Sequence, residues 1–213
     1  MKSKKRQLLN SRLYLVLDKG VCPDGKSIKV FSGLGKGAVD LVQLRANTTC
    51  DKELLEEARV LKQMSRSMGV LFIINNRPDI ARMAEADGLH LGQSDIPLVE
   101  ARRIFKGNKI IGISCHNLSQ ALSAQSRGAD YISIGPLFRT KTKPGLVPVD
   151  PGLITMVSQK ISIPFFVIGG INRSNIGRAI SYGARRVALC RAICAARNIK
   201  KASLELKKRL AFT

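Results

Sequence analysis

The stretch "KELLEEARVLKQMSRSMGVLFIINNR", residues 52–77, joins two patterns at a single glycine. Before Gly69, apolar residues recur at a spacing of about 3.6 residues, which is typical of an amphipathic helix. Gly69 punctuates the return to an apolar run, 70–74, whose length suits a buried strand. The stretch therefore predicts one helix followed by one strand.

The same order recurs along the whole chain, in which eight short apolar runs alternate with helical segments such as 150–160. The runs are "LYLVL" (13–17), "VDLVQL" (39–44), "VLFII" (70–74), "GLHLG" (88–92), "IIGIS" (110–114), "YISIG" (131–135), "PFFVIGG" (164–170) and "RVALCRAI" (186–193). Strands that alternate with helices and show no hairpin signal predict a parallel sheet. Eight such units in 213 residues predict an α/β fold with one closed (β/α)8 TIM barrel.

An open, doubly wound sheet is the competing architecture. It usually carries a GxGxxG pattern after its first strand, where this chain has "DKGVCPDGK", residues 18–26. We therefore predict the barrel, as a single domain over residues 1–213 with basic terminal segments at 1–12 and 196–213. An odd count of five cysteines without a CxxC pair predicts buried, reduced thiols.

The charge balance indicates which classes of partner the chain could bind. The chain has 36 Lys and Arg against 15 Asp and Glu, a net charge of +21, which suits nucleic acid, anionic membranes or phosphorylated small molecules. It shows no nucleic-acid-binding motif and no apolar segment of the ~18–20 residues that a membrane span needs. We expect solvated basic faces, phosphorylated small-molecule substrates, no nucleic acid and no membrane. Because the first apolar run, 13–17, is too short for a signal peptide, we expect a cytoplasmic protein.

Barrel enzymes carry their active sites where the strands end. The polar residues at those ends are Asp18, Gln43, Arg45, Asn75, Asn76, Gln93, Asp95, Ser114, His116, Thr140, Lys141, Thr142, Lys143, Cys190 and Arg191, with Gly169 and Gly170 after the seventh run. Core packing does not account for so many polar groups at one rim. We therefore predict the active site there.

The rim is strongly cationic, because it carries Arg45, Arg139, Lys141, Lys143 and Arg191. Such a rim suits a polyanion, with one hard metal ion held by Asp95, an Asn carbonyl and substrate oxygens. In "IGGINRSN", residues 168–175, two glycines precede an expected helix start, where N–H groups favour phosphate.

The chain lacks a Ser/His/Asp arrangement, paired carboxylates at neighbouring strand ends and an HExxH motif. Acid–base hydrolysis is therefore disfavoured, and electrostatic stabilisation of a departing phosphate group is favoured.

Structural explanations compete for several of these residues. Asp95 precedes Ile-Pro and could be a helix N-cap. Residues 75–76 precede Arg-Pro and could form a turn. His90 alternates with two leucines and is expected to be a packed strand residue, whereas His116 could serve either role. The pair at 169–170 is a weak signal by itself.

Taken in order, the strand ends resemble thiamine phosphate synthases. The matching segments are "VQLRAN" (42–47), "FIINNR" (72–77), "ADGLHLGQSD" (86–95), "IIGISCH" (110–116), "GADYISIGPLFRTKTKP" (128–144) and "IPFFVIGGI" (163–171), within a likeness that spans about 13–193. The resemblance implies a transferase that joins hydroxymethylpyrimidine diphosphate to thiazole phosphate and uses Mg²⁺. Pyrophosphate leaves, and the thiazole nitrogen attacks without a general base.

The resemblance also assigns roles to residues. Gln43, Arg45, Asn47, Asn75, Ser114 and Lys143 would hold the pyrimidine diphosphate, with Arg45, Ser114 and Lys143 as the catalytic residues. Asp95 and Asn76 would bind Mg²⁺, and Thr140, Lys141, Thr142, Gly170, Cys190 and Arg191 would hold the thiazole phosphate or line its site.

Three positions depart from the pattern that the family usually shows. Asn47 stands where the family has Lys, Asn76 where it has a second Asp, and Arg191 where it has Ser. The first two departures remove one charge of each sign, so we expect a working synthase with weaker metal affinity. Two alternatives stay open, namely a thiazole-phosphate tautomerase that uses His116 and a non-catalytic RNA binder.

Overall fold

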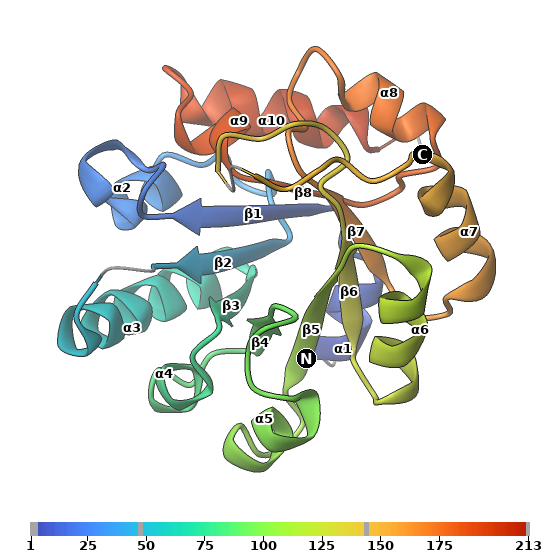
Figure 1. Ribbon diagram of the computed structural model, residues 1–213. Helices are drawn as coiled ribbons and strands as arrows, with labels where there is room; N and C mark the ends of the chain where they lie inside the picture. Colours follow the sequence, from blue (N-terminus) through green and yellow to red (C-terminus); the bar gives the residue numbers. More distant parts are fainter. Residues whose placement is uncertain (1–3, 47–48, 143–144, 212–213) are drawn as a thin grey trace.

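The structure is a computed structural model that describes residues 4–46, 49–142 and 145–211. Eight parallel strands close into a barrel in the order β1 to β8, each paired with its neighbours in sequence and β8 with β1 (Figure 1). The strands are β1 Leu13–Asp18, β2 Leu41–Arg45, β3 Leu71–Asn75, β4 Gly88–Leu91, β5 Ile110–Cys115, β6 Tyr131–Ile134, β7 Phe165–Ile168 and β8 Val187–Leu189. All eight predicted strands and the barrel are confirmed.

Helices form a ring outside the strands, because parallel neighbours need a crossover connection (Figure 1). The helices are α1 Lys4–Leu9, α2 Ser27–Ser32, α3 Asp51–Met68, α4 Pro78–Met83, α5 Leu98–Ile104, α6 Leu118–Ser126, α7 Gly152–Lys160, α8 Ile176–Ser181, α9 Arg191–Cys194 and α10 Ile199–Arg209, with a short 3-10 helix η1 at Pro23–Gly25. Gly69 ends α3 in the left-handed conformation, at a φ of 68°, as its place between helix and strand predicts.

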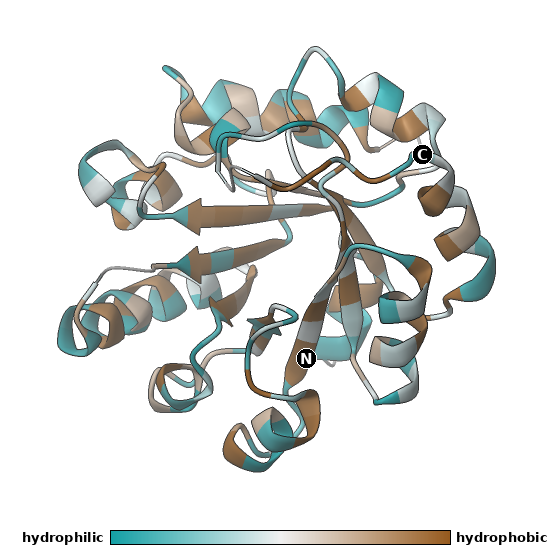
Figure 2. Ribbon diagram, in the orientation of Figure 1, coloured by the Kyte–Doolittle hydropathy of each residue, from teal (hydrophilic) through white to brown (hydrophobic). Residues whose placement is uncertain are grey.

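Alternate strand residues divide into two apolar clusters, as the two-residue period of a strand requires. Leu15, Val42 and Phe72 belong to a large cluster between the strands and the helices. Tyr14 and Leu71 belong to a smaller cluster inside the barrel. Figure 2 shows the strands mostly hydrophobic and the helices banded with hydrophilic residues, which matches a sheet covered on its outer face.

The amino-terminal face of the barrel is closed by α1, which lies behind the strands in Figure 1. Leu8 of α1 is buried in the inner cluster. Lys4 and Lys5 reach Asp87 and Asp130 at 2.8 and 2.9 Å. The basic residues here therefore form ion pairs with buried carboxylates, which differs from the solvated faces that the composition predicts.

The basic carboxyl-terminal segment also belongs to the packed structure. In α10, Ser203 and Leu206 are buried, while Lys207 forms an ion pair with Asp40 just before β2. None of the helices in the described ranges is long and apolar enough to cross a membrane.

Candidate active site

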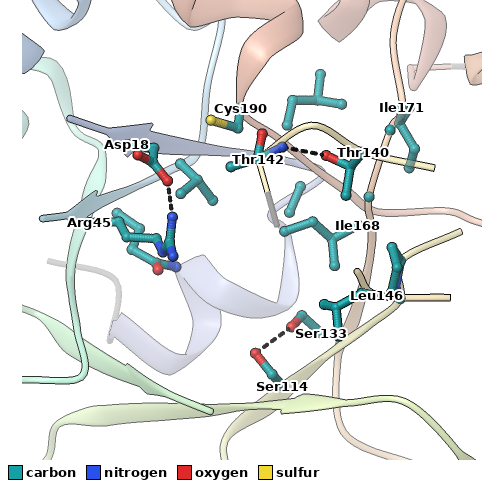
Figure 3. A pocket seen from close by; sticks show the side chains of 18 of the residues that line it. Asp18, Arg45, Ser114, Ser133, Thr140, Thr142, Leu146, Ile168, Ile171 and Cys190 are labelled. Carbon is teal, nitrogen blue, oxygen red and sulfur yellow. Dashed lines mark hydrogen bonds and ion pairs between the residues drawn. The ribbon is translucent and has the colours of Figure 1, made fainter. Parts of the chain in front are cut away.

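A cavity of about 450 Å³ opens where the strands end, lined by residues from the ends of β1 to β8 and from the loops that follow (Figure 3). The predicted site residues on its wall are Gln43, Arg45, Asn75, Asn76, Asp95, Ser114, Thr140, Lys141, Thr142, Gly170, Cys190 and Arg191. Two further predicted residues, Asn47 and Lys143, lie outside the described residues. The structure thus brings the other candidates, which are spread over 149 positions of sequence from Gln43 to Arg191, to one cavity.

The polarity of the inward-facing side chains changes along each strand. In β3, Leu71 and Ile73 belong to the inner apolar cluster, and Asn75, two residues further, lines the cavity. In β2, Leu41 lies in that cluster, while Gln43 lines the cavity. The apolar half of each strand holds the barrel closed, and the polar end faces the cavity, so the site is placed by rigid elements.

Arg45 at the end of β2 forms an ion pair with Asp18 at the end of β1. Asp18 is 6% exposed, and its other carboxylate oxygen accepts the N–H of Gly20 at 2.9 Å. The two strand ends are neighbours in the barrel register. Asp18 therefore fixes the guanidinium of Arg45 at the cavity wall (Figure 3).

Asn75 and Asn76 lie at the end of β3, beside the neighbouring strand β4. Asn76 has a φ of 61°, a left-handed conformation that Asn tolerates better than most residues. Its N–H donates to the carbonyl of His90 at 2.9 Å, and its Oδ1 accepts Nδ2 of Asn75 at 2.5 Å. The segment bends at Asn76, in line with the competing turn interpretation, and both residues also line the cavity, as the site prediction requires.

Asp95 is not the N-cap of the next helix, so that interpretation is wrong. Pro97 holds the cap position and helix α5 begins only at Leu98, so two residues separate the helix from Asp95. The Asp95 carboxylate instead turns back to accept the N–H of Gly92 at 2.6 Å. One of its oxygens thereby secures the β4–α5 loop at the cavity wall.

The floor of the cavity is a set of hydrogen-bonded polar side chains. His90 is 5% exposed and packs in β4, as predicted, but it also lines the cavity. Its Nε2 lies 2.9 Å from Oγ of Ser114, and Ser133 Oγ is 3.5 Å from the same oxygen (Figure 3). Ser133 was missed in the sequence, although it lies two residues before Gly135, on the same face of β6.

Two glycines after β7 allow the loop after β6 to approach closely. Gly169 and Gly170 have φ values of 103° and 63°. A Cβ added at Gly170 would lie 2.4 Å from the Arg139 carbonyl oxygen, and one at Gly169 would lie 2.3 Å from Cα of Pro136. The β6–α7 loop is also held by the N–H of Phe138, which donates to Gly169 at 3.0 Å.

Thr140, Lys141 and Thr142 follow this anchored segment. The N–H of Thr142 donates to Oγ1 of Thr140 at 3.2 Å, and Figure 3 shows Thr140 near Ile171 and Thr142 toward Cys190. All three residues line the cavity.

The helix start expected after the two glycines is present, although a short loop comes first. Helix α8 begins at Ile176, after a loop of residues 171–175. Asn172 and Asn175 stabilise this loop, since their side-chain amides donate to the carbonyl of Gly170 at 3.2 and 3.0 Å. Gly170 thus lines the cavity from a loop that is tied to the N-cap residue of α8, Asn175.

Cys190 and Arg191 close the wall between β8 and α9. Cys190 is half-buried, and its sulfur lies beside the cavity in Figure 3. The thiol of Cys194 donates to the carbonyl of Val16 at 3.4 Å, and the neighbouring thiols of Cys190 and Cys22 together with burial raise its pKa. The prediction of buried thiols holds for Cys22, Cys115 and Cys194, but Cys50 is exposed at the start of α3.

His116 also lines the cavity, with its Nδ1 2.6 Å from the carbonyl oxygen of Gly135. Because a carbonyl only accepts, this nitrogen must carry a proton. His116 is therefore oriented by the start of the β6–α7 loop.

The site has few protein ligands for a metal ion. In the described part of the chain, no group of three or more His, Cys, Asp or Glu side chains could hold one. Asp95 and Asn76 offer oxygen atoms, which suit a hard cation that completes its coordination with water and substrate oxygens.

Known proteins resemble this chain over almost its whole length. A family model described as thiamine monophosphate synthase matches residues 13–193. The thiamine-phosphate synthase of Shouchella clausii is 41% identical over 92% of this chain and 94% of its own, and that of Halalkalibacterium halodurans is 42% identical over 89% and 90%. Among solved structures, a thiamine phosphate pyrophosphorylase from Pyrococcus furiosus superposes with a TM-score of 0.84 and 30% identity, covering 97% of this chain and 96% of that one.

Proposed function

Because the chain belongs to the thiamine monophosphate synthase family, and is therefore a transferase of thiamine biosynthesis, we propose that its cavity joins hydroxymethylpyrimidine diphosphate to thiazole phosphate. The products are thiamine phosphate and pyrophosphate. The single observation that best supports this assignment is the convergence of cations, hydroxyls and amides on one cavity that all eight strand ends line. Two anionic substrates need such a wall.

The reaction requires a good leaving group more than a base. The bond between the pyrimidine methylene carbon and the diphosphate oxygen breaks, and its electron pair leaves with pyrophosphate. The lone pair of the thiazole nitrogen then forms the new C–N bond, so no proton has to be removed. The protein must mainly stabilise negative charge as it builds up on the departing diphosphate.

The diphosphate end of the cavity lies by β2, β3 and β4. A guanidinium carries five N–H donors, so Arg45 can bind phosphate oxygens while one nitrogen stays on Asp18. Lys143 is assigned to the same diphosphate, although it lies outside the described residues. Asn47, also outside them, would add an amide where the family usually has a cation.

Mg²⁺ fits the donors on this wall. The Asp95 carboxylate and the Asn76 amide oxygen would hold it, in line with the preference of hard cations for oxygen. When bound, the ion would neutralise charge on the diphosphate oxygens. The N–H of Gly92 fixes the Asp95 carboxylate from one side, at 2.6 Å, and Asn75 fixes the amide of Asn76. Since Asn76 brings no charge, we infer a weaker metal site than one with two carboxylates.

The thiazole phosphate would lie against the loops after β6, β7 and β8. Thr140 and Thr142 supply hydroxyls, and Lys141 supplies a cation on the same wall. Gly170 allows close approach of a phosphate to the backbone, because it has no side chain. Arg191 could bind that phosphate through two parallel N–H bonds, which the serine usual in the family could not do. Cys190 lies next to it on the cavity wall.

The decisive experiment is one incubation of the purified chain with both substrates and Mg²⁺. We expect thiamine phosphate and pyrophosphate to appear in equal amounts, followed by mass spectrometry and a pyrophosphate assay. An Asp95→Ala variant is the matched negative control, because it should lose the product and keep the fold. Pyrophosphate without thiamine phosphate would show hydrolysis instead of coupling, and absence of both products at saturating Mg²⁺ would refute the proposal.

A further inference from the structure

Beneath the cavity, five side chains form an unbroken row of hydrogen bonds across the barrel. Nε2 of Gln43 lies 2.5 Å from the hydroxyl of Tyr14, which lies 2.9 Å from the hydroxyl of Tyr131. Nδ1 of His90 lies 2.9 Å from that second hydroxyl, and its Nε2 lies 2.9 Å from Oγ of Ser114. The two ends of the row, Gln43 and Ser114, line the cavity.

The two tyrosines in the middle of the row are fully buried. Tyr14 and Tyr131 are 1% and 0% exposed, and Phe166 packs edge-on against both rings at 5.2 and 5.7 Å between centroids. Burial raises the pKa of each phenol well above its usual value. Each tyrosine therefore keeps one O–H proton, and each can donate a single hydrogen bond.

The number of protons limits the row to two arrangements when the imidazole is neutral. Each contact must contain one hydrogen, and each phenol donates in one direction only. Because an unpaired hydroxyl is costly in a buried site, each phenol must also make that one donation within the row. If Gln43 donates to Tyr14, then Tyr14 donates to Tyr131, Tyr131 donates to Nδ1 of His90, and Nε2–H of His90 donates to Ser114. In the reverse arrangement, Ser114 donates to His90, and Tyr14 finally donates to the amide oxygen of Gln43.

The two arrangements present opposite hydrogen-bonding groups to the cavity. In the first, Gln43 turns its Oε1 acceptor outward, and the Ser114 hydroxyl is left to donate. In the second, Gln43 turns its NH₂ outward, and Ser114 can only accept. The structure places Nε2 of Gln43 on Tyr14, which corresponds to the first arrangement.

We propose that Tyr14, Tyr131 and His90 are positioning residues that set this polarity, and thereby select an aminopyrimidine over its oxo counterpart. The inference rests on the proposed function, in which Gln43 and Ser114 hold the pyrimidine. An exocyclic amino group donates and the adjacent ring nitrogen accepts, which complements an acceptor on Gln43 and a donor on Ser114. The oxo analogue has a carbonyl acceptor and a ring N–H donor, so it meets two mismatched contacts.

The first test needs no turnover and uses the two histidines of the chain. We expect ¹⁵N NMR of the histidine-labelled protein near neutral pH to show opposite tautomers. His90 should carry its proton on Nε2, whereas His116 should carry it on Nδ1, where it donates to Gly135 at 2.6 Å. A His116→Gln variant assigns the two signals. A proton on Nδ1 of His90, or a charged His90, would overturn the proposed polarity.

The second test measures selectivity. For the wild type, we expect kcat/KM for the aminopyrimidine diphosphate to exceed that for the oxo analogue by at least ~100-fold, since unmatched polar contacts in a built site are costly. Tyr131→Phe removes one hydroxyl from the middle of the row, and we expect the ratio to fall by at least ~10-fold. Phe166→Leu alters the packing of the same rings without touching the row, so the ratio should stay unchanged.

The outcomes separate the two levels of the inference. Activity of the wild type with neither pyrimidine would defeat the proposed function but leave the tautomer measurement to judge the row. An active Tyr131→Phe variant with lower stability and an unchanged ratio would show a purely structural role and overturn the inference. If Tyr131→Phe does not fold, Tyr14→Phe interrupts the same row at the next position and carries the same expectation.

Discussion

Replacement of Gly170 by alanine tests whether the close approach of two loops holds the active site together. The residue has a φ of 63°, and a Cβ there would lie 2.4 Å from the Arg139 carbonyl oxygen, where real Cβ contacts stay beyond about 3.0 Å. The loops must therefore separate by at least about 0.6 Å. Thr140 and Thr142 follow directly on the displaced segment and would move with it.

Two effects of different size follow from this geometry. The left-handed conformation costs a residue with a Cβ about 1–2 kcal/mol of stability. Misplacement of catalytic contacts by about 1 Å can cost roughly 100-fold in rate. We therefore expect Gly170→Ala to lower the free energy of unfolding modestly and kcat/KM for thiamine phosphate formation by about two orders of magnitude.

Two alanine variants separate these effects. Gly107 has a φ of 88° and no atom within 4 Å of an added Cβ, so Gly107→Ala carries the backbone strain without the collision. Gly177 lies in α8 with open space around it, and Gly177→Ala should be stabilising by up to about 1 kcal/mol. The assays are thermal unfolding and steady-state kinetics. If Gly170→Ala loses the same stability as Gly107→Ala and keeps wild-type kcat/KM, the loop contact does not position the site.

Three further predictions follow from the site and from the barrel's closed end. Asn76→Asp adds a carboxylate beside Asp95, so the Mg²⁺ concentration that gives half the maximal rate should fall several-fold, as a metal titration of the initial rate would show; an unchanged requirement would place Asn76 outside the metal site. Burial alone would raise the pKa of Asp130, but Arg102, the N–H of Ile111 and Lys5 lower it, so the stability it contributes is present above about pH 4 and is lost as the pH falls through the lowered value. Asp130→Asn should cost about 3 kcal/mol at pH 7 and much less at pH 3, measured by urea unfolding at both values, and an equal loss at both would contradict this origin. Because the coupling needs no general base, His116→Asn should keep synthase activity within about tenfold in the same kinetic assay, and loss of ~100-fold or more, the low end of what general acid–base catalysis contributes, would require a proton transfer in the reaction.

The residues at the strand ends could be predicted from the sequence, because they depend only on where each strand stops along the chain. A parallel barrel places every strand end at one face, so Gln43, Asn75 and Ser114 could be collected without knowledge of any contact between them. Their presence on one cavity wall followed from the fold. The loop conformations could not be predicted in this way, because each depends on contacts with side chains from other parts of the sequence.

Asp95 illustrates the limit for short loops. An acid before Ile-Pro satisfies the composition of an N-cap, yet its carboxylate accepts the N–H of Gly92, three residues back. Residue types alone do not distinguish the two choices. The path of residues 171–175 is another example, since Asn172 and Asn175 stabilise it through side-chain bonds to the carbonyl of Gly170 that the order of residue types does not specify.

The row beneath the cavity shows a different limit. Tyr14 and Tyr131 are 117 positions apart, and each alone is an ordinary apolar strand residue in the sequence. The barrel closure that makes them neighbours is a property of the whole fold. A weaker signal was nevertheless present, because His90 shares the inward face of β4 with Gly92, which also lines the cavity.

The fold also explains why the cations at the site have few carboxylates beside them. Asp40, Asp87 and Asp130 each directly precede a strand, and each accepts backbone N–H groups of a neighbouring strand at the closed end of the barrel. These carboxylates are thus committed to closing the sheet, and they attract lysines from α1 and α10 to that end. At the open end, Asp18 is paired with Arg45, and Asp95 is the other carboxylate on the cavity wall that the structure describes. Arg139, Lys141 and Arg191 therefore face the cavity with little compensating charge, and the resulting positive field favours two phosphorylated substrates over neutral competitors.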